Sequence, residues 1–192
     1  MTKVIFVDEW IFKFLLGSPL NQYWWLEKMW VILAVGLVYL VPLILVACWF
    51  WSAQTKRVVF KAGLAGLFSW LVISKIVVYF VHRPRPIESI IGVRELIFAR
   101  SDFSFPSDHA AAIFAVALTI RLCGHRKLGN FLLIVGAIMS FARIMVGVHF
   151  PLDIIAGAGI GCLTALLIWQ LRKFIDRHFT EPFVALMQKL HL

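Results

Sequence analysis

The segment FPSDHAAAIF, residues 105–114, places three hydrogen-bonding side chains, Ser107, Asp108 and His109, directly before an apolar run. Helix capping accounts for two of them, because Ser or Asp at a helix start accepts hydrogen bonds from free backbone N–H groups. Capping does not require a histidine. Since the same N–H groups and the helix dipole attract anions, the segment predicts a histidine beside an anion-binding helix N-terminus.

A second histidine stands in ARIMVGVHFPLD, residues 142–153. Pro151 suits the first turn of a helix, which places His149 just before that helix and Asp153 in its first turn. At this spacing we expect the Asp153 carboxylate to accept a hydrogen bond from one imidazole N–H. The other ring nitrogen is then left unprotonated and directed outward, which is the arrangement that an activated histidine nucleophile requires.

Four cations are candidates to hold an anion near these histidines. Arg83 and Arg85 lie in HRPRP, residues 82–86, and Lys75 and Arg143 lie within apolar stretches. A cation inside an apolar span is costly and by default marks a function. Each motif alone has an ordinary structural explanation, but all of them on one face of a fold would favour a shared site.

The hydrophobic content predicts that these residues belong to a membrane protein. Hydrophobic residues make up 61% of the 192 residues and charged residues 15%, whereas a soluble domain is about half apolar and about a quarter charged. Most of the apolar blocks approach the roughly 20 residues that cross a bilayer. We expect an all-α integral membrane protein, a helical bundle of five transmembrane helices with six as the alternative count. The blocks cover residues 30–51, 58–81, 109–123, 131–148 and 153–171.

The chain shows no internal repeat, linker or low-complexity tract, so we expect a single domain over residues 1–192. Residues 1–20 combine apolar residues at helical spacing with interleaved charges, which predicts an N-terminal helix lying in the membrane interface. The core that bears the motifs covers residues 70–170, and residues 172–192 form a tail. The three cysteines are scattered and predict neither a disulfide framework nor a metal site.

The net charge of +9 arises mostly from three basic clusters, at residues 56–61, 121–127 and 172–189. With five spans these three clusters, the last of which lies in the tail, share one side of the membrane. The positive-inside rule makes that side cytoplasmic. Topology thus explains the charge, and we expect no nucleic-acid partner. The connections 82–108 and 147–152 share the opposite side, so we expect a site that faces the extracytoplasmic side of a plasma or inner membrane.

Together the motifs resemble the three-part signature of the type 2 phosphatidic acid phosphatase superfamily. That signature has Lys followed by Arg-Pro, then Pro-Ser-Gly-His, then Ser-Arg, five residues, His, three residues and Asp, and this chain resembles it over roughly residues 70–170. Asp108 replaces Gly, Ala142 replaces Ser, and Lys75 is one residue too far from Arg83 and three too far from Arg85. The small size, the interfacial helix, FPSDH and GVHFPLD are similar to bacterial undecaprenyl-diphosphate phosphatases of this superfamily.

The resemblance implies a membrane lipid-diphosphate phosphatase that hydrolyses undecaprenyl diphosphate to undecaprenyl phosphate and phosphate through a phosphohistidine intermediate. His149 would be the nucleophile, held in position by Asp153, and His109 would donate and then accept the proton. No cofactor and no metal are expected, because fixed cations neutralise the phosphate charge. Asp108 would either disfavour some headgroups or contact His109. The implied phosphate-binding set is Arg85, Arg143, Ser107, Lys75, Arg83 and Asp108.

Three alternatives remain open at this stage. A phosphatidylglycerol-phosphate or phosphatidate phosphatase would use the same site, and a lipid phosphotransferase would pass the phosphoryl group to an acceptor other than water. The non-enzymatic alternative is a lipid or anion transporter with Lys75 and Arg143 on the anion path. The expected partners are a polyprenyl diphosphate lipid and the membrane lipids, and the sequence makes no prediction of oligomeric state.

Overall fold

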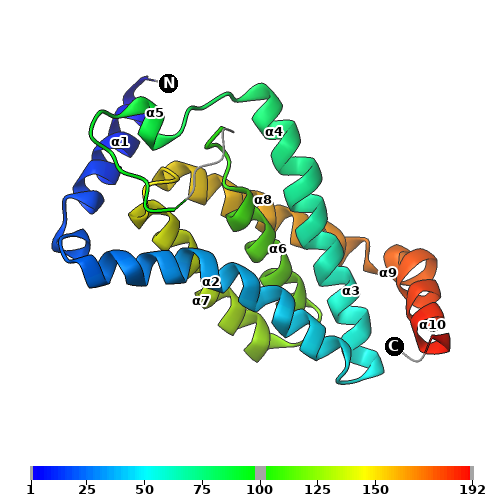
Figure 1. Cartoon of the computed structure of the whole chain (residues 1–192). Helices are drawn as coiled ribbons and strands as arrows, with labels where there is room; N and C mark the ends of the chain where they lie inside the picture. Colours follow the sequence, from blue (N-terminus) through cyan, green and yellow to red (C-terminus); the bar gives the residue numbers. More distant parts are fainter. Residues whose placement is uncertain (1, 98–102, 191–192) are drawn as a thin grey trace.

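The computed structural model describes residues 2–97 and 103–190, and these residues form helices and loops without a strand. The predicted all-α class is confirmed (Figure 1). In chain order the elements are α1 (Thr2–Leu16), η1 (Pro19–Asn21), α2 (Trp24–Trp49), α3 (Ala53–Phe68), η2 (Ser69–Ile73), α4 (Ser74–Phe80), α5 (Pro86–Ser89), α6 (Asp108–Leu122), α7 (Arg126–Met145), α8 (Pro151–Gln170), α9 (Arg172–Ile175), η3 (Asp176–Thr180) and α10 (Glu181–Lys189).

Four helical segments in the described part of the chain are long and apolar enough to cross a membrane: α2, the continuous helix Gln54–Phe80, α7 and α8. The remaining predicted span, residues 109–123, corresponds to α6, which has only 15 residues. At 1.5 Å per residue α6 rises about 22 Å, less than the hydrocarbon core of about 30 Å. Its N-terminal end, where the PSDH motif lies, can therefore be set below the membrane surface.

Helix α6 forms the centre of the bundle and packs against α8, α7 and α3 (Figure 1). Glycines on α8 allow its closest contact. A Cβ atom at Gly157 would lie 2.3 Å from the Ser107 carbonyl oxygen, and one at Gly161 would lie 2.4 Å from the Ala111 carbonyl oxygen. The two backbones therefore approach closely because these side chains are absent. This contact brings the start of α6 beside the start of α8.

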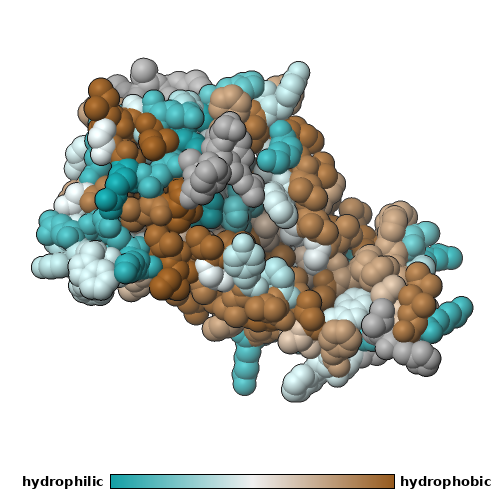
Figure 2. All heavy atoms as spheres, viewed as in Figure 1, coloured by the Kyte–Doolittle hydropathy of each residue, from teal (hydrophilic) through white to brown (hydrophobic). Residues whose placement is uncertain are grey.

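The surface shows how the bundle meets its surroundings. Figure 2 shows hydrophobic residues along the middle of the molecule over α2 and α3, and polar residues gathered at the end that carries α1 and α5. Large apolar side chains such as Ile32, Tyr39 and Leu43 of α2 are exposed. A soluble protein rarely exposes a continuous apolar surface of this kind. The chain is a multi-pass membrane protein.

The two ends of the chain pack against the bundle. In α1, Phe12 is fully buried and its ring centroid lies 5.1 Å from that of Phe150. The segment predicted as a tail is helical through α9, η3 and α10, and it contacts α3. Lys61 forms an ion pair with Asp176, and the Arg57 Nε lies 2.9 Å from the Glu181 Oε1. Residues 172–190 are therefore an integral part of the folded bundle.

Candidate active site

His149 lies in the tight turn between α7 and α8 and is only 2% exposed. Gly147 in the same turn has φ +84°, and a Cβ atom there would lie 2.9 Å from the Arg94 carbonyl oxygen, so the turn requires glycine. The His149 Nδ1 lies 2.9 Å from the Ser104 carbonyl oxygen. A carbonyl only accepts hydrogen bonds, so Nδ1 carries the proton and Nε2 carries the lone pair. Within the described part of the chain, the buried Nε2 has no hydrogen-bond partner.

Asp153 is fully buried. The sequence predicted that its carboxylate accepts a hydrogen bond from His149, and the structure does not show that bond. Its Oδ2 lies 3.7 Å from the His149 Nδ1, and the same Oδ2 accepts a hydrogen bond from the Phe150 N–H at 2.9 Å. The reason is local: an acidic residue in the first turn of α8 reaches back to the backbone before the helix, as in a capping box. Asp153 therefore fixes the turn that carries His149 and supplies a nearby negative charge.

Burial lowers the pKa of His149 from its ordinary value of 6.5, because the site offers little solvation to a charged imidazole. The nearby Asp153 carboxylate opposes this shift, and the Arg143 and Arg85 guanidinium groups add to it. The net direction favours the neutral imidazole near neutral pH. The neutral form with a free Nε2 lone pair is the nucleophilic form of histidine.

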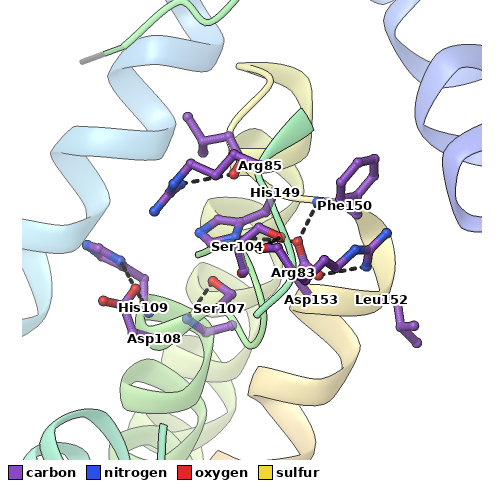
Figure 3. A network of polar contacts seen from close by, with 12 residues as sticks. Arg83, Arg85, Ser104, Ser107, Asp108, His109, His149, Phe150, Leu152 and Asp153 are labelled. Atoms are coloured by element: carbon purple, nitrogen blue, oxygen red, sulfur yellow. Dashed lines mark hydrogen bonds and ion pairs between the residues drawn. The ribbon is translucent and has the colours of Figure 1, made fainter. Parts of the chain in front are cut away.

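Arg83 does not lie with the other cations. Its Nη1 contacts the Asp153 Oδ1 at 2.8 Å, its Nη2 contacts the Asp8 Oδ2 at 2.6 Å, and its guanidinium carbon lies 4.0 Å from the centre of the Phe150 ring. Figure 3 shows Arg83 and Arg85 on opposite sides of His149. Arg83 thus pairs with two carboxylates and lines neither of the pockets at the histidines, which argues against its predicted place in the phosphate-binding set.

Arg85 and Arg143 are buried and line one cavity of about 270 Å³ together with Asp108 and His109. The Arg85 Nη1 donates to the Val148 carbonyl oxygen at 3.1 Å, which orients its guanidinium. A smaller adjoining pocket is lined by Lys75, Arg85, Asp108 and His149, among others, and Lys75 is an exposed residue at its edge. Both pockets share Arg85 and Asp108. The structure thus brings both histidines and three of the four predicted cations to one place.

The N-terminus of α6 offers fewer free N–H groups than the sequence suggests. The Ser107 N–H donates to the Asp153 carbonyl oxygen at 2.9 Å, and the Ser107 hydroxyl accepts a long hydrogen bond from the Ala110 N–H at 3.5 Å. The His109 N–H donates to the Asp108 Oδ1 at 2.8 Å. Side chains and backbone therefore use these donors within the fold. Anion binding would therefore depend mainly on the charged side chains that line the two pockets.

Sequence reasoning missed three residues that position the site: Ser104, Trp70 and Asp8. Ser104 contributes through its backbone carbonyl, which no sequence pattern marks. Trp70 donates its Nε1–H to the Asp108 Oδ2 at 3.1 Å. The Asp8 Oδ1 accepts a hydrogen bond from the Leu152 N–H at 2.9 Å. The available signal for Asp8 was its position as a carboxylate among the apolar residues of the N-terminal helix. A carboxylate is costly to bury without a partner, so a buried Asp8 would be expected to have one.

Residues 58–177 match the PAP2 superfamily. This chain belongs to the PAP2 superfamily. YbjG of Escherichia coli (strain K12) is 38% identical over 151 residues, which cover 76% of this chain and 75% of YbjG. BcrC of Bacillus subtilis (strain 168), named an undecaprenyl-diphosphatase, is 32% identical over 78% of this chain and 74% of BcrC. The predicted superfamily membership is confirmed, and the chain is a membrane phosphatase of this superfamily.

Two solved structures share the fold. LpxE of Aquifex aeolicus superposes with a TM-score of 0.69 at 22% identity, covering 85% of this chain and 95% of LpxE. A transmembrane PAP2 type phosphatidylglycerolphosphate phosphatase from Bacillus subtilis gives a TM-score of 0.66 at 22% identity, covering 93% of this chain and 90% of that one. At this identity the likeness supports the helical arrangement of PAP2 proteins and leaves the substrate open.

Proposed function

We propose that this PAP2 protein hydrolyses undecaprenyl diphosphate to undecaprenyl phosphate and inorganic phosphate. The observation that carries the chemistry is the state of His149: its Nδ1–H is held by the Ser104 carbonyl, and its buried Nε2 is without a partner in the described residues. His149 lines a pocket that Arg85 and Lys75 also line. An unprotonated nitrogen beside fixed cations suits attack on a phosphoryl group.

In the proposed reaction, the His149 Nε2 attacks the terminal phosphorus and the bond to the bridging oxygen breaks. Undecaprenyl phosphate leaves, with His109 able to donate a proton to the departing oxygen. Water then attacks the phosphohistidine, His109 accepts its proton, and phosphate is released with His149 restored. Arg85 and Arg143, with Lys75 at the edge, would neutralise charge on the phosphoryl oxygens.

An apolar groove next to the site supports a lipid substrate. A cavity of about 340 Å³ begins at Asp108 and His109 and continues between α2, α3 and α6. Apart from these two residues and Trp70 its lining consists of apolar residues and glycine, for example Val41, Gly66 and Val116. Such a groove fits an isoprenoid chain whose diphosphate reaches the histidines. The name of the Bacillus subtilis relative BcrC supports the undecaprenyl diphosphate assignment.

We place the protein in the plasma or inner membrane with the site facing the extracytoplasmic side. The support is the charge distribution: the clusters at 56–61, 121–127 and 172–189 all lie at the membrane side opposite the histidines. From that side the enzyme would return a lipid carrier to the monophosphate form after outward delivery of cell-envelope precursors.

The decisive experiment measures phosphate release from undecaprenyl diphosphate by purified protein in detergent with EDTA. We expect turnover by the wild type and trapping of acid-labile phosphate on the protein, both absent from His149→Ala.

Faster turnover of phosphatidylglycerol phosphate would reassign the substrate. Dependence on an added acceptor would reassign the reaction as phosphotransfer, and complete loss in EDTA restored by Mg²⁺ would overturn the cation-based mechanism. No phosphate release from any lipid would favour the transporter alternative.

A further inference from the structure

Asp108 stands at the site where the superfamily signature has glycine, and it has an unusual set of partners. Its Oδ1 lies 2.7 Å from the His109 Nδ1 and accepts the His109 backbone N–H at 2.8 Å. Its Oδ2 accepts the Trp70 indole N–H at 3.1 Å. One carboxylate thus joins the first turn of α6 to the helix formed by α3, η2 and α4. Figure 3 shows the Asp108 carboxylate directed at the His109 ring.

Helix capping does not explain this arrangement. Ser107 is already the N-cap residue of α6, and its hydroxyl faces the Ala110 N–H. A capping carboxylate accepts from N–H groups two or three residues ahead, whereas Asp108 accepts from its immediate neighbour and from a side chain of another helix. Phosphate binding does not explain it either, because an ionised carboxylate repels phosphate. Two of the three contacts described above are made with His109, and the shortest is with its ring.

Trp70 lies in the π-helical turn η2, which joins α3 to α4. This position lets its indole reach the Asp108 carboxylate. The wider turn carries Trp70, whose ring lines the apolar groove beside Ala112 and Val116. The indole N–H is a donor only, so it orients the carboxylate without competing for the His109 proton. The two oxygens of Asp108 are thereby given separate tasks: one holds the indole and the other holds the imidazole.

We infer that Asp108, oriented by Trp70, is a positioning residue for His109, an inference that rests on the role of His109 in the proposed function. A carboxylate at Nδ1 requires that nitrogen to keep its proton, so the His109 Nε2 is the atom that gives a proton to the leaving oxygen and takes one from water. Between these two steps His109 is the neutral imidazole, and the carboxylate holds its remaining proton on Nδ1. His109 and His149 therefore use the same nitrogen for chemistry, but one is held by a carboxylate and the other by a backbone carbonyl.

The test is a double-mutant cycle on undecaprenyl diphosphate turnover with Asp108→Asn, His109→Ala and the combined variant. Asn keeps the size of the side chain but presents either an uncharged acceptor or a donor to Nδ1. We expect Asp108→Asn to lower kcat by at least about tenfold, because general acid–base catalysis contributes about 10²–10⁴-fold, while KM changes little. In the His109→Ala background the same change should have no further effect, since the residue it positions is gone.

Trp70→Phe should reduce kcat less than Asp108→Asn, and Trp169→Phe on α8 is the matched indole control.

The outcomes separate the two proposals. If His109→Ala keeps wild-type turnover, the role of His109 in the proposed function is wrong. If His109→Ala is impaired but Asp108→Asn turns over like the wild type, only the positioning role fails. If the losses from Asp108→Asn and His109→Ala multiply in the combined variant, Asp108 acts separately from His109 and the inference is overturned. Thermal unfolding of each purified variant checks that turnover is compared between folded proteins.

Discussion

At the scale of single residues, the protonation of His149 governs when the enzyme can act. Its neutral form is the nucleophile, and burial lowers its pKa below the ordinary 6.5. The neutral fraction is therefore retained as the pH falls through 6.5 and is lost only at lower pH. We expect the acidic limb of kcat/KM against pH, which reports the free enzyme, to have its midpoint below 6.5.

The substrate diphosphate also ionises in this range, so its own titration is followed by phosphorus NMR in the same detergent. A limb that tracks the substrate titration belongs to the lipid, and the enzyme limb is what remains after this correction. An enzyme midpoint at or above 6.5 would show that His149 is not held neutral by burial, and the nucleophile would have to be activated by another route.

The Asp8 contact is a second residue-scale feature with a measurable consequence. Asp8 and Asp153 share the Arg83 guanidinium, and both carboxylates are buried. Asp8→Asn should weaken this link and loosen the turn that carries His149. We expect kcat to fall roughly tenfold, because disturbing a buried charged hydrogen bond costs about 1–3 kcal/mol. KM should change little, since Asp8 does not line the pockets of the site. Glu9→Gln, the neighbouring carboxylate of α1, is the control and should be silent. Equal losses from both variants would reduce the effect to general destabilisation of α1.

Residue types and spacing in the sequence predicted which side chains would meet, and the structure brings His109, His149, Arg85 and Arg143 together. The partners were less predictable. The Ser104 carbonyl is a backbone atom, so only the fold reveals it, and the choice between Arg83 and Arg85 depends on which side of His149 each side chain lies. Two arginines separated by one proline give no sequence signal for that choice.

At the scale of elements, the site depends on how closely α8 approaches α6. The Ser107 N–H donates to the Asp153 carbonyl oxygen at 2.9 Å, so the PSDH motif and the His149 turn are joined directly. A Cβ atom at Gly157 would lie 2.3 Å from the Ser107 carbonyl oxygen. Because that neighbour is backbone, the helices must separate to accommodate it. Gly157→Ala should therefore lower both the melting temperature and turnover, by at least about tenfold for kcat, since misplacing catalytic groups by an ångström is costly.

Gly159 on the same helix provides the matched control. Beyond its own stretch of α8, a Cβ atom there meets no atom of the described residues within 4 Å, and Ala favours a helix over Gly by about 1 kcal/mol. Gly159→Ala should keep wild-type turnover with an equal or higher melting temperature. If Gly157→Ala behaves the same way, the close helix contact is not what holds the two motifs together.

The apolar blocks in the sequence predicted the helices well because a membrane-spanning segment must be continuously apolar. Whether α6 spans the membrane was harder to predict, because it has only 15 residues. It is held by packing against α8, α7 and α3, which the sequence does not show. Residues 172–192 were predicted as a tail because they follow the last apolar block. Their ion pairs and the packing of Phe183 against Phe60 use residues that are distant in sequence, which local patterns do not show.

At the scale of the whole molecule, we expect the charge asymmetry to set the orientation in the membrane. The orientation in turn decides which pool of lipid the site can reach. Helices α1 and α5 lie at one end of the bundle, and α9 and α10 lie at the other (Figure 1). Contacts of α1 with Phe150 and Leu152, next to His149, put the histidine site at the first end. The basic clusters occupy the second end. An enzyme with its site at the extracytoplasmic surface would act on a carrier lipid only after that lipid had been delivered outward.

This orientation predicts how introduced cysteines will react in intact cells. Ile91 is fully exposed in the loop on the side of the site, and Gln54 is exposed at the start of α3 on the opposite side. In a background with Cys48, Cys123 and Cys162 replaced, Ile91→Cys should react with a membrane-impermeant thiol reagent, whereas Gln54→Cys should react only after the cells are opened. Phosphatase activity of each variant confirms that it is folded. Labelling of Gln54→Cys but not Ile91→Cys in intact cells would reverse the topology, and the enzyme would then act on a cytoplasmic lipid pool with the same residues.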